Sequence, residues 1–259
     1  MADLLPQYDN PPVTETILGI EFRPLATWGM PHFGLFWAKI REKYSKFSVQ
    51  PPLPEESHGS GLIISLNPIP VVRCWFIDYE DKWLLQVQNS RFISNWKKKK
   101  DDSDYPSYTL FRDRFVEHYE QFQQFLSDEN FDELSLYQAE ISYINHVDIG
   151  SDFDKLPEIF PVFSTFLENS FLPVPQNGGF NFEYRMPENR GRLYINAQRV
   201  LNLETGKEFV QFTVSAKTLI ASNSKEAAYE ALDHGHEWVV RGFTDFTSKS
   251  MHTLWKRTQ

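Results

Sequence analysis

The chain has very little cysteine and no long apolar run. Cys74 is the single cysteine among 259 residues, so no disulfide can form within the chain, and a lone thiol is typical of a reducing compartment. No stretch comes near the roughly 18 consecutive apolar residues that span a bilayer. The first residues, MADLLPQYDNPP, lack the basic and apolar segments of a signal peptide. We therefore expect a soluble, cytoplasmic protein that does not contact a membrane.

The common signatures of catalytic and metal sites are also missing. The sequence contains no Gly-x-Ser-x-Gly, no Gly-Lys-Ser/Thr phosphate loop, no His-Glu-x-x-His and no Cys-x-x-Cys. The closest histidines, His234 and His236, would point about 200° apart on a helix and could not share a metal ion. Glu15, Glu21 and Glu140 could pair as acid and base only if their strands were neighbours. We predict no metal, no cofactor and no catalytic residue.

Positive charge is scarce, whereas aromatic residues are abundant. The chain has 26 Lys and Arg against 35 Asp and Glu, a net charge of −9. This average field repels phosphate, so nucleic acid is possible as a partner but disfavoured. Aromatic residues make up 15% of the chain and include 22 Phe, so we expect large rings to dominate the core.

The order of predicted elements is similar in the two halves of the chain. The first half reads as a strand (Val13–Phe22), a helix with apolar residues from Phe33 to Tyr44, strands, and a helix from Tyr108 to Leu126. Its expected strands are Leu62–Leu66, Val71–Tyr79 and Lys82–Ser90, after a loop at Val49–Gly61. The second half repeats this order: a strand (Leu134–Val147), a short helix near Phe160–Phe171, strands at 181–186, 192–202 and 208–217, and a helix (Ser224–Phe246) that Ser222 or Ser224 could cap.

These elements predict an α+β protein with two similar β-α-β-β-β-α halves, at residues 1–130 and 131–259. Two antiparallel sheets backed by helices would meet about a pseudo-twofold axis, either as separate halves or as one continuous globule. Alternating strands and helices often look self-similar without duplication, so that alternative stays open. A cleft between such halves is a common position for a ligand.

Polar side chains gather on one face of several predicted strands. Gln86 and Gln88 share a face with Leu84, and Asn196 and Gln198 share a face on a later strand. Such a face can simply be solvated. The functional interpretation is that the amides line the cleft and read a ligand by hydrogen bonds.

The segment that follows, Arg91–Tyr108, combines basic and aromatic residues. Lys97–Lys100 and the acids after it could form a solvated loop, or they could form the edge of an anion site with an aromatic stacking surface. On the functional interpretation, the candidate ligand-binding residues are Gln86, Gln88, Arg91, Asn95, Trp96, Lys97, Tyr105, Asn196 and Gln198.

Several blocks resemble a sporadically distributed prokaryotic family of uncharacterised function and about this length. They are the Pro-Pro strand NPPVTETILGIEF, Leu-Gln-x-Gln at 85–88, Asn-Trp-basic at 95–97, Tyr-Pro-x-Tyr at 105–108 and Tyr-x-Asn at 143–145. This chain has Lys97 where the resemblance leads us to expect arginine, which weakens the case for a bidentate anion clamp. The resemblance implies a shared fold, and its sporadic distribution is typical of defence-associated or mobile genes.

We therefore expect a non-enzymatic binding or interaction protein that recognises a partner protein or a small anionic ligand. The alternative is an enzyme that acts on nucleotides or nucleic acid at the Arg91–Tyr108 edge. A nucleic-acid mimic that exploits the charge of −9 ranks last, because lysines are interspersed among the acids. The sequence does not predict the oligomeric state.

Overall fold

One antiparallel sheet of nine strands organises the part of the chain that the computed structural model describes, residues 4–54, 72–99, 105–148, 155–164, 171–173, 175, 177–203 and 205–259. The strand order is β2-β3-β4-β5-β1-β6-β9-β8-β7. The strands are β1 (Val13–Phe22), β2 (Lys46–Gln50), β3 (Arg73–Ile77), β4 (Trp83–Gln88), β5 (Arg91–Lys97), β6 (Leu136–Val147), β7 (Gly179–Arg185), β8 (Gly191–Leu201) and β9 (Glu208–Leu219).

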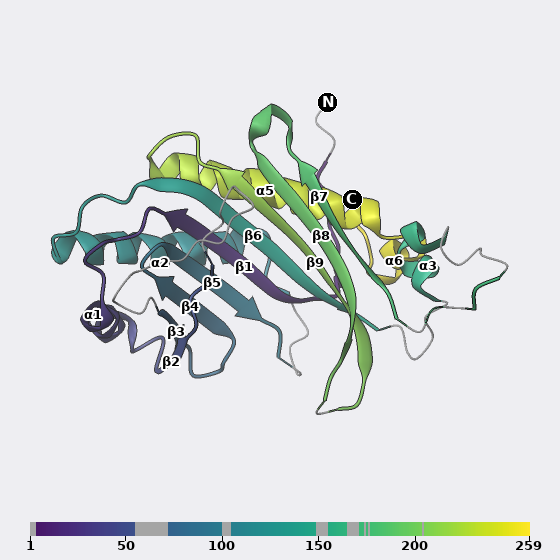
Figure 1. Cartoon of the computed structure of the whole chain (residues 1–259), viewed down its shortest axis with the longest axis horizontal. Coiled ribbons are helices and arrows are strands. Elements are labelled where there is room, and N and C mark those ends of the chain that lie inside the picture. The colour runs from purple at the N-terminus through teal and green to yellow at the C-terminus, as the bar shows by residue number, and fades with distance from the viewer. Residues whose placement is uncertain are drawn as a thin grey trace.

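Three longer helices pack on one face of this sheet (Figure 1). They are α1 (Met30–Ile40), α2 (Tyr108–Asp128) and α5 (Lys225–Phe246), and the shorter elements include α3 (Leu156–Ile159) and α6 (Lys249–Leu254). The hydroxyls of Ser107 and Ser224 accept a backbone N–H and so cap the first turns of α2 and α5. Of the two caps expected for α5, Ser224 is therefore the one present.

Aromatic rings fill the space between the helices and the sheet. Phe92 of β5 stacks on Phe122 of α2 with ring centroids 5.0 Å apart, and it also contacts Phe115. Phe36 of α1 meets Phe76 of β3 edge to face at 5.7 Å. The apolar faces expected for these helices are therefore confirmed as the core, and rings supply much of its buried area.

The prediction of two sheets is wrong in one respect: the strands of both halves form one sheet. β1 and β6 pair antiparallel in the middle of it, from Val13↔Asn145 to Phe22↔Leu136. Hydrogen bonding across this central pair joins the halves edge to edge. Their polar strand surfaces therefore point the same way and do not face each other across a hollow.

Two strands were not expected from the sequence. β5 (Arg91–Lys97) follows β4 after a two-residue turn at Asn89 and Ser90, so Gln88 pairs directly with Arg91. The predicted strand Lys82–Ser90 leaves Arg91, Asn95 and Trp96 just beyond its end, whereas the structure places them in a strand of their own. β2 (Lys46–Gln50) begins before the predicted loop at Val49–Gly61. The predicted strand Leu62–Leu66 and the acidic residues after the lysine run, at 101–104, lie outside the described residues.

Candidate functional site

Most of the predicted ligand-binding residues lie on the face of the sheet opposite α1, α2 and α5. The pairs Gln86↔Ile93, Gln88↔Arg91, Asn95↔Ile17 and Asn196↔Thr213 put their side chains on this side. Asn196 and Gln198 lie on β8, and β5, β1, β6 and β9 separate that strand from β4. The structure thus brings Gln86 close to Asn95 and Gln88 close to Arg91, whereas Asn196 and Gln198 stay apart from both.

Hydrogen bonds to other side chains already occupy the amides of Gln86 and Asn95. Gln86 Oε1 accepts from Arg73 Nη1 at 2.8 Å and from Trp75 Nε1 at 2.9 Å. Gln86 Nε2 donates to Asn95 Oδ1 at 2.6 Å, and Asn95 Nδ2 donates to Glu15 Oε1 at 2.6 Å. A buried amide must find partners, and these two find them in each other and in neighbouring strands. The hydrogen bonds of these two amides connect four strands, β3, β4, β5 and β1.

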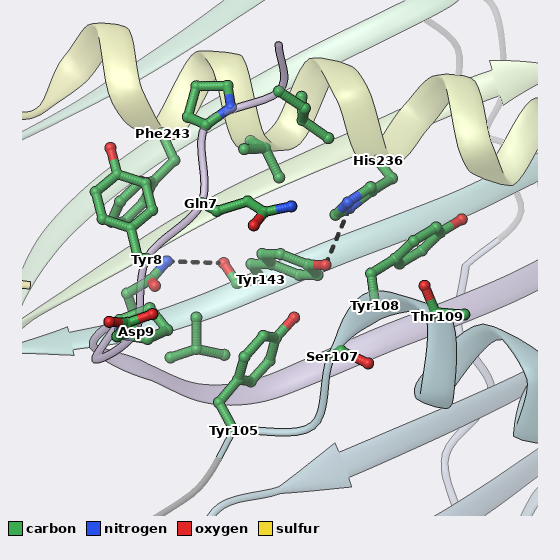
Figure 2. Close-up of a pocket in the computed structure, with 16 residues that line it drawn as sticks. Gln7, Tyr8, Asp9, Tyr105, Ser107, Tyr108, Thr109, Tyr143, His236 and Phe243 are labelled. Carbon is green, nitrogen blue, oxygen red and sulfur yellow. Dashed lines mark hydrogen bonds between the residues drawn. The ribbon is translucent and has the colours of Figure 1, made fainter. Parts of the chain in front are cut away.

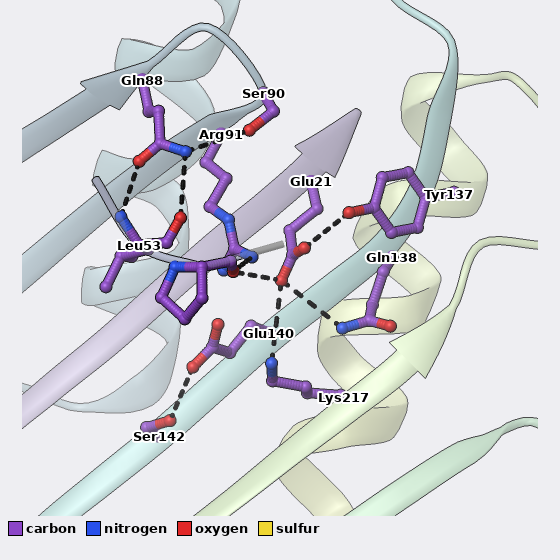
Figure 3. Close-up of polar contacts among 11 residues, drawn as sticks. Glu21, Leu53, Gln88, Ser90, Arg91, Tyr137, Gln138, Glu140, Ser142 and Lys217 are labelled. Atoms are coloured by element: carbon purple, nitrogen blue, oxygen red, sulfur yellow. Dashed lines mark hydrogen bonds and ion pairs between the residues drawn. The ribbon is translucent and has the colours of Figure 1, made fainter. Parts of the chain in front are cut away.

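Gln88 and Arg91 bind the chain segment at residues 51–54 (Figure 3). The Gln88 side chain accepts from Leu53 N at 2.9 Å and donates to Leu53 O at 3.2 Å, as a neighbouring strand would do. Arg91 Nη2 donates to Pro54 O at 2.7 Å. Both side chains are therefore engaged in packing a connection onto the sheet.

A buried cluster of charges lies where β1 meets β6, also in Figure 3. Arg91 and Glu21 form an ion pair at 3.1 Å, with side chains 5% and 2% exposed. Glu21 also accepts from Tyr137 and lies 3.9 Å from Lys217. Burial raises the pKa of the Glu140 carboxyl and the Lys217 charge opposes that rise. Glu21 and Glu140 are thus on neighbouring strands. The positive charges of Arg91 and Lys217 balance the negative charges of these two side chains.

Trp96 and Tyr105 lie on the opposite, helix-covered side. Trp96 is fully buried in the core, so it presents no stacking surface to a ligand, and it contacts the ring of Tyr105 edge to face at 5.7 Å. Lys97 points to the other face of the sheet, with its ammonium 5.2 Å from the centre of the Trp75 ring. The basic and aromatic members of the Arg91–Tyr108 segment therefore do not share one surface.

A pocket of about 600 Å³ opens on the helix side, between the start of α2, α5 and the central strands β1 and β6 (Figure 2). Of the nine predicted residues, Tyr105 alone is among the described residues that line it. The lining residues are Leu5, Pro6, Gln7, Tyr8, Asp9, Pro11, Val13, Tyr105, Ser107, Tyr108, Thr109, Tyr143, Asn145, His236, Val240 and Phe243. This volume is within the range of small-molecule sites.

His236 occupies one wall of the pocket between two tyrosines. Its Nδ1 lies 3.0 Å from the Tyr143 hydroxyl, and its ring stacks on Tyr108 with centroids 3.7 Å apart and planes at 5°. The Tyr108 hydroxyl donates to Asp233 at 2.7 Å, which fixes that ring. Burial lowers the pKa of His236 to about 4, so the imidazole is uncharged at neutral pH. Burial also raises the pKa of Tyr143 and Tyr105, which keeps both phenols protonated.

Asn145 contributes a buried amide to the pocket. Its Nδ2 donates to Phe212 O at 2.9 Å and to Tyr143 O at 3.3 Å. Because both partners are carbonyls, the side-chain orientation is determined by the hydrogen bonds. Its Oδ1 has no hydrogen-bond partner, although the residue is fully buried.

The N-terminal segment covers one side of the pocket and is bound to the end of the chain. Tyr8 pairs with Arg257, and the backbone N–H groups of Asp9 and Thr258 donate to Lys256 O and Gln7 O. The Tyr8 hydroxyl lies 3.0 Å from Thr244 Oγ1 on α5. The end of the chain therefore holds in place the N-terminal segment that lines this wall.

Sequence reasoning missed this pocket because its residues come from four separate segments. Two signals could have indicated it. The Tyr-Pro-x-Tyr and Tyr-x-Asn blocks, already singled out by the resemblance, supply Tyr105, Tyr108, Tyr143 and Asn145. Nothing in the sequence around His236 indicates the pocket, because its only notable feature there is the spacing to His234, which relates to metal binding.

Within the described ranges, no three His, Cys, Asp or Glu side chains gather closely enough to hold a metal ion. Among the helices in those same ranges, none combines the length and the apolar character that crossing a membrane requires. Comparison with protein-family models and with curated proteins gave no match to this chain.

Proposed function

We propose that the protein is a non-enzymatic binding protein that takes a small molecule into the pocket between its two halves. The observation that carries this proposal is the cavity of about 600 Å³, which β1 and α2 of the first half line together with β6 and α5 of the second. Central pockets between structural halves are frequent ligand positions. Three of the blocks on which the family resemblance rests contribute Pro11, Tyr105, Tyr108, Tyr143 and Asn145 to the lining.

The chemistry of the lining supports binding over catalysis. The His236 imidazole has its Nδ1 engaged by Tyr143, and its pKa of about 4 makes it a weak base at neutral pH. The tyrosines have raised pKa values, which is the opposite of an activated phenolate. These groups suit a site that holds a ligand by shape and hydrogen bonds.

We also propose that the halves are related by duplication and by a pseudo-twofold axis near the β1–β6 pair. Starting from that pair, the order β1-β5-β4-β3 on one side corresponds to β6-β9-β8-β7 on the other. In the same scheme α2 corresponds to α5, because each long helix follows the last strand of its half. The pocket would then lie close to the axis, where both halves contribute.

The nucleotide or nucleic-acid enzyme is the weaker candidate. Its site required Arg91, Trp96, Lys97 and Tyr105 on one edge, but Arg91 is paired with Glu21 and Trp96 is in the core. A partner protein, a role in defence and a cytoplasmic location stay proposals. The last is supported by the presence of a single cysteine, Cys74, which cannot form a disulfide within the chain.

The test is a fragment screen by thermal shift and ligand-observed NMR, on the wild-type protein and on Val240→Phe. Val240 is half-buried on α5 and lines the pocket, so the larger ring fills space that a ligand would use. We expect fragments that bind the wild type and lose at least about tenfold in affinity in the variant, a change of roughly 1.4 kcal/mol. Val200→Phe is the matched control, because Val200 is half-buried on β8 and outside the lining.

Fragments that bind the wild type and Val240→Phe equally well would place the binding site elsewhere. Loss of binding in the Val200→Phe control as well would attribute the effect to general destabilisation. The first result would contradict the pocket as the functional site, whereas the second would show that the loss in Val240→Phe is not specific to the pocket.

A further inference from the structure

The charges around the pocket bear on the kind of ligand that it holds. The described lining residues include neither lysine nor arginine, and the one acid among them, Asp9, is exposed. His236 stays uncharged at neutral pH because burial lowers its pKa to about 4. An anionic group placed here would lose its hydration without gaining a counter-ion. The lining therefore disfavours carboxylates and phosphates.

The shape and polarity of the walls favour a flat, partly apolar molecule. The stacked rings of Tyr108 and His236 form one wall, and Val240 and Phe243 of α5 add apolar surface. The ring of Tyr143 lies between those of His236 and Tyr105, with centroids 5.9 Å and 6.1 Å away (Figure 2). Aromatic ligands gain from stacking and edge contacts with such rings beyond the area they bury.

Asn145 lines the pocket but does not present its side-chain oxygen to a ligand. Its Nδ2 donates to Tyr143 O of β6 and to Phe212 O of β9, so the side chain cannot turn without losing these hydrogen bonds. Its Oδ1 is buried from the pocket as well as from solvent. The aromatic walls and the lack of a cationic side chain among the described lining residues therefore determine the class of ligand.

We propose that the pocket binds an uncharged aromatic molecule. This inference rests on the proposed function, since it names the class of ligand for the same pocket. It departs from the anionic ligand that the sequence led us to expect, because the basic residues of that expectation lie on other surfaces.

Matched pairs of probes test the charge requirement. Indole-3-acetamide and indole-3-acetate have nearly the same shape and differ in charge, as do 4-hydroxybenzamide and 4-hydroxybenzoate. Titration of the wild-type protein by ligand-observed NMR should show each amide binding at least about tenfold more tightly than its carboxylate. Binding of the amides should be lost in Val240→Phe and kept in Val200→Phe.

A second pair tests the aromatic requirement without changing the protein. Cyclohexanecarboxamide is close in size to benzamide but has no aromatic face. We expect it to bind at least about fivefold more weakly than benzamide.

Three results would overturn the ligand class: carboxylates that bind as tightly as the amides, equal binding of benzamide and cyclohexanecarboxamide, or no binding of any neutral probe. If any of these occurred while the screen still gave fragments sensitive to Val240→Phe, the pocket would remain a binding site for another class. The absence of any fragment sensitive to Val240→Phe would instead remove the proposed function itself.

Discussion

Arg91 illustrates how a residue that looks like a ligand contact in the sequence serves the fold. Its guanidinium lies against Glu21 and donates to Pro54 O, and the side chain is 5% exposed. Lys97, six residues later on the same strand and face, is 38% exposed and lies 3.9 Å from Glu15. The two basic residues therefore have very different energetic roles, although both were candidates for the same anion site.

We predict that Arg91→Ala lowers the free energy of unfolding by about 3 kcal/mol, because it leaves Glu21 buried without its closest counter-charge. Lys217 at 3.9 Å still offsets part of that charge, so the effect should fall at the lower end of the usual range. Lys97→Ala should change stability by less than about 0.5 kcal/mol, as exposed pairs do. Denaturant unfolding of both variants measures the difference, and similar values for the two would contradict this account.

His118 leads to a prediction about the stability of the protein at acidic pH. It is buried on α2, where Nδ1 contacts Arg114 O at 2.6 Å and Nε2 lies 3.2 Å from the Tyr44 hydroxyl. Burial, assisted by the Arg114 and Lys43 charges, lowers its pKa to about 4, against the opposing effects of the hydrogen bond to Arg114 O and the Glu117 charge. Since the unfolded chain binds this proton near the ordinary value of 6.5, the unfolded state holds more protons between pH 6.5 and 4.

Stability must therefore fall as the pH drops through that window, by roughly 3 kcal/mol for this group. His118→Gln keeps a polar side chain but cannot titrate. We expect the variant to lose less stability than the wild type between pH 6.5 and 4, as measured by urea unfolding at several pH values. Parallel pH profiles for the two proteins would show that His118 does not contribute.

At the level of elements, α5 packs closely against the sheet at Gly235. A Cβ built on Gly235 would lie 2.8 Å from Ile141 Cγ2 and 3.0 Å from Thr218 Oγ1, which are side chains of β6 and β9. Glycine here permits the close approach of helix and sheet that forms the wall of the pocket carrying His236. Gly34 on α1 is exposed, and a Cβ built on it would have no neighbouring atom within 4 Å.

The same substitution should consequently have opposite effects at these two glycines. Gly235→Ala should destabilise the protein by about 1–2 kcal/mol, because overpacking outweighs the better helix propensity of alanine. Gly34→Ala should stabilise it by about 0.5–1 kcal/mol. Thermal and denaturant unfolding of the pair provide the measurement. A gain in stability at both positions would mean that the helix moves away from the sheet at little cost.

The elements with strong periodicity could be predicted from the sequence, and the connections between them could not. The apolar stripe of α2 and the alternation in β6 and β9 led to boundaries close to those observed. β5 was missed because its turn, Asn89 and Ser90, lacks the glycine that usually marks a two-residue hairpin. With β5 read as a loop, its side chains were expected at a binding edge instead of in the sheet.

For the whole molecule, alternation along a strand shows which residues share a face but not which strands are neighbours. The polar face was therefore anticipated from residues such as Gln88 and Asn196, whereas the single continuous sheet was not. The pocket needed still more information, because Tyr105, Tyr143 and His236 meet only once α2, β6 and α5 have been placed. These long-range contacts have no local signature in the chain.

The continuous sheet leads to a prediction about cooperativity. The β1–β6 ladder joins the halves through backbone hydrogen bonds. On the side of the sheet that the helices cover, α2 and α5 are linked, because Arg112 and Tyr108 of α2 both hydrogen-bond to Asp233 of α5. The N-terminal segment, which belongs to the first half, is also paired with the end of the chain. Unfolding one half alone would break all of these contacts and expose an apolar edge, so we expect both halves to unfold together.

Gly235→Ala tests this expectation, because the substitution lies in the second half. Hydrogen exchange followed by mass spectrometry should show that the variant lowers the protection of β4 in the first half by the same free energy, about 1–2 kcal/mol, as that of β8 in the second. The comparison is made on peptides whose amides exchange through global unfolding. If β8 lost protection while β4 kept the wild-type value, the halves would be independent folding units in spite of their shared sheet, and the pocket between them could open without unfolding either one.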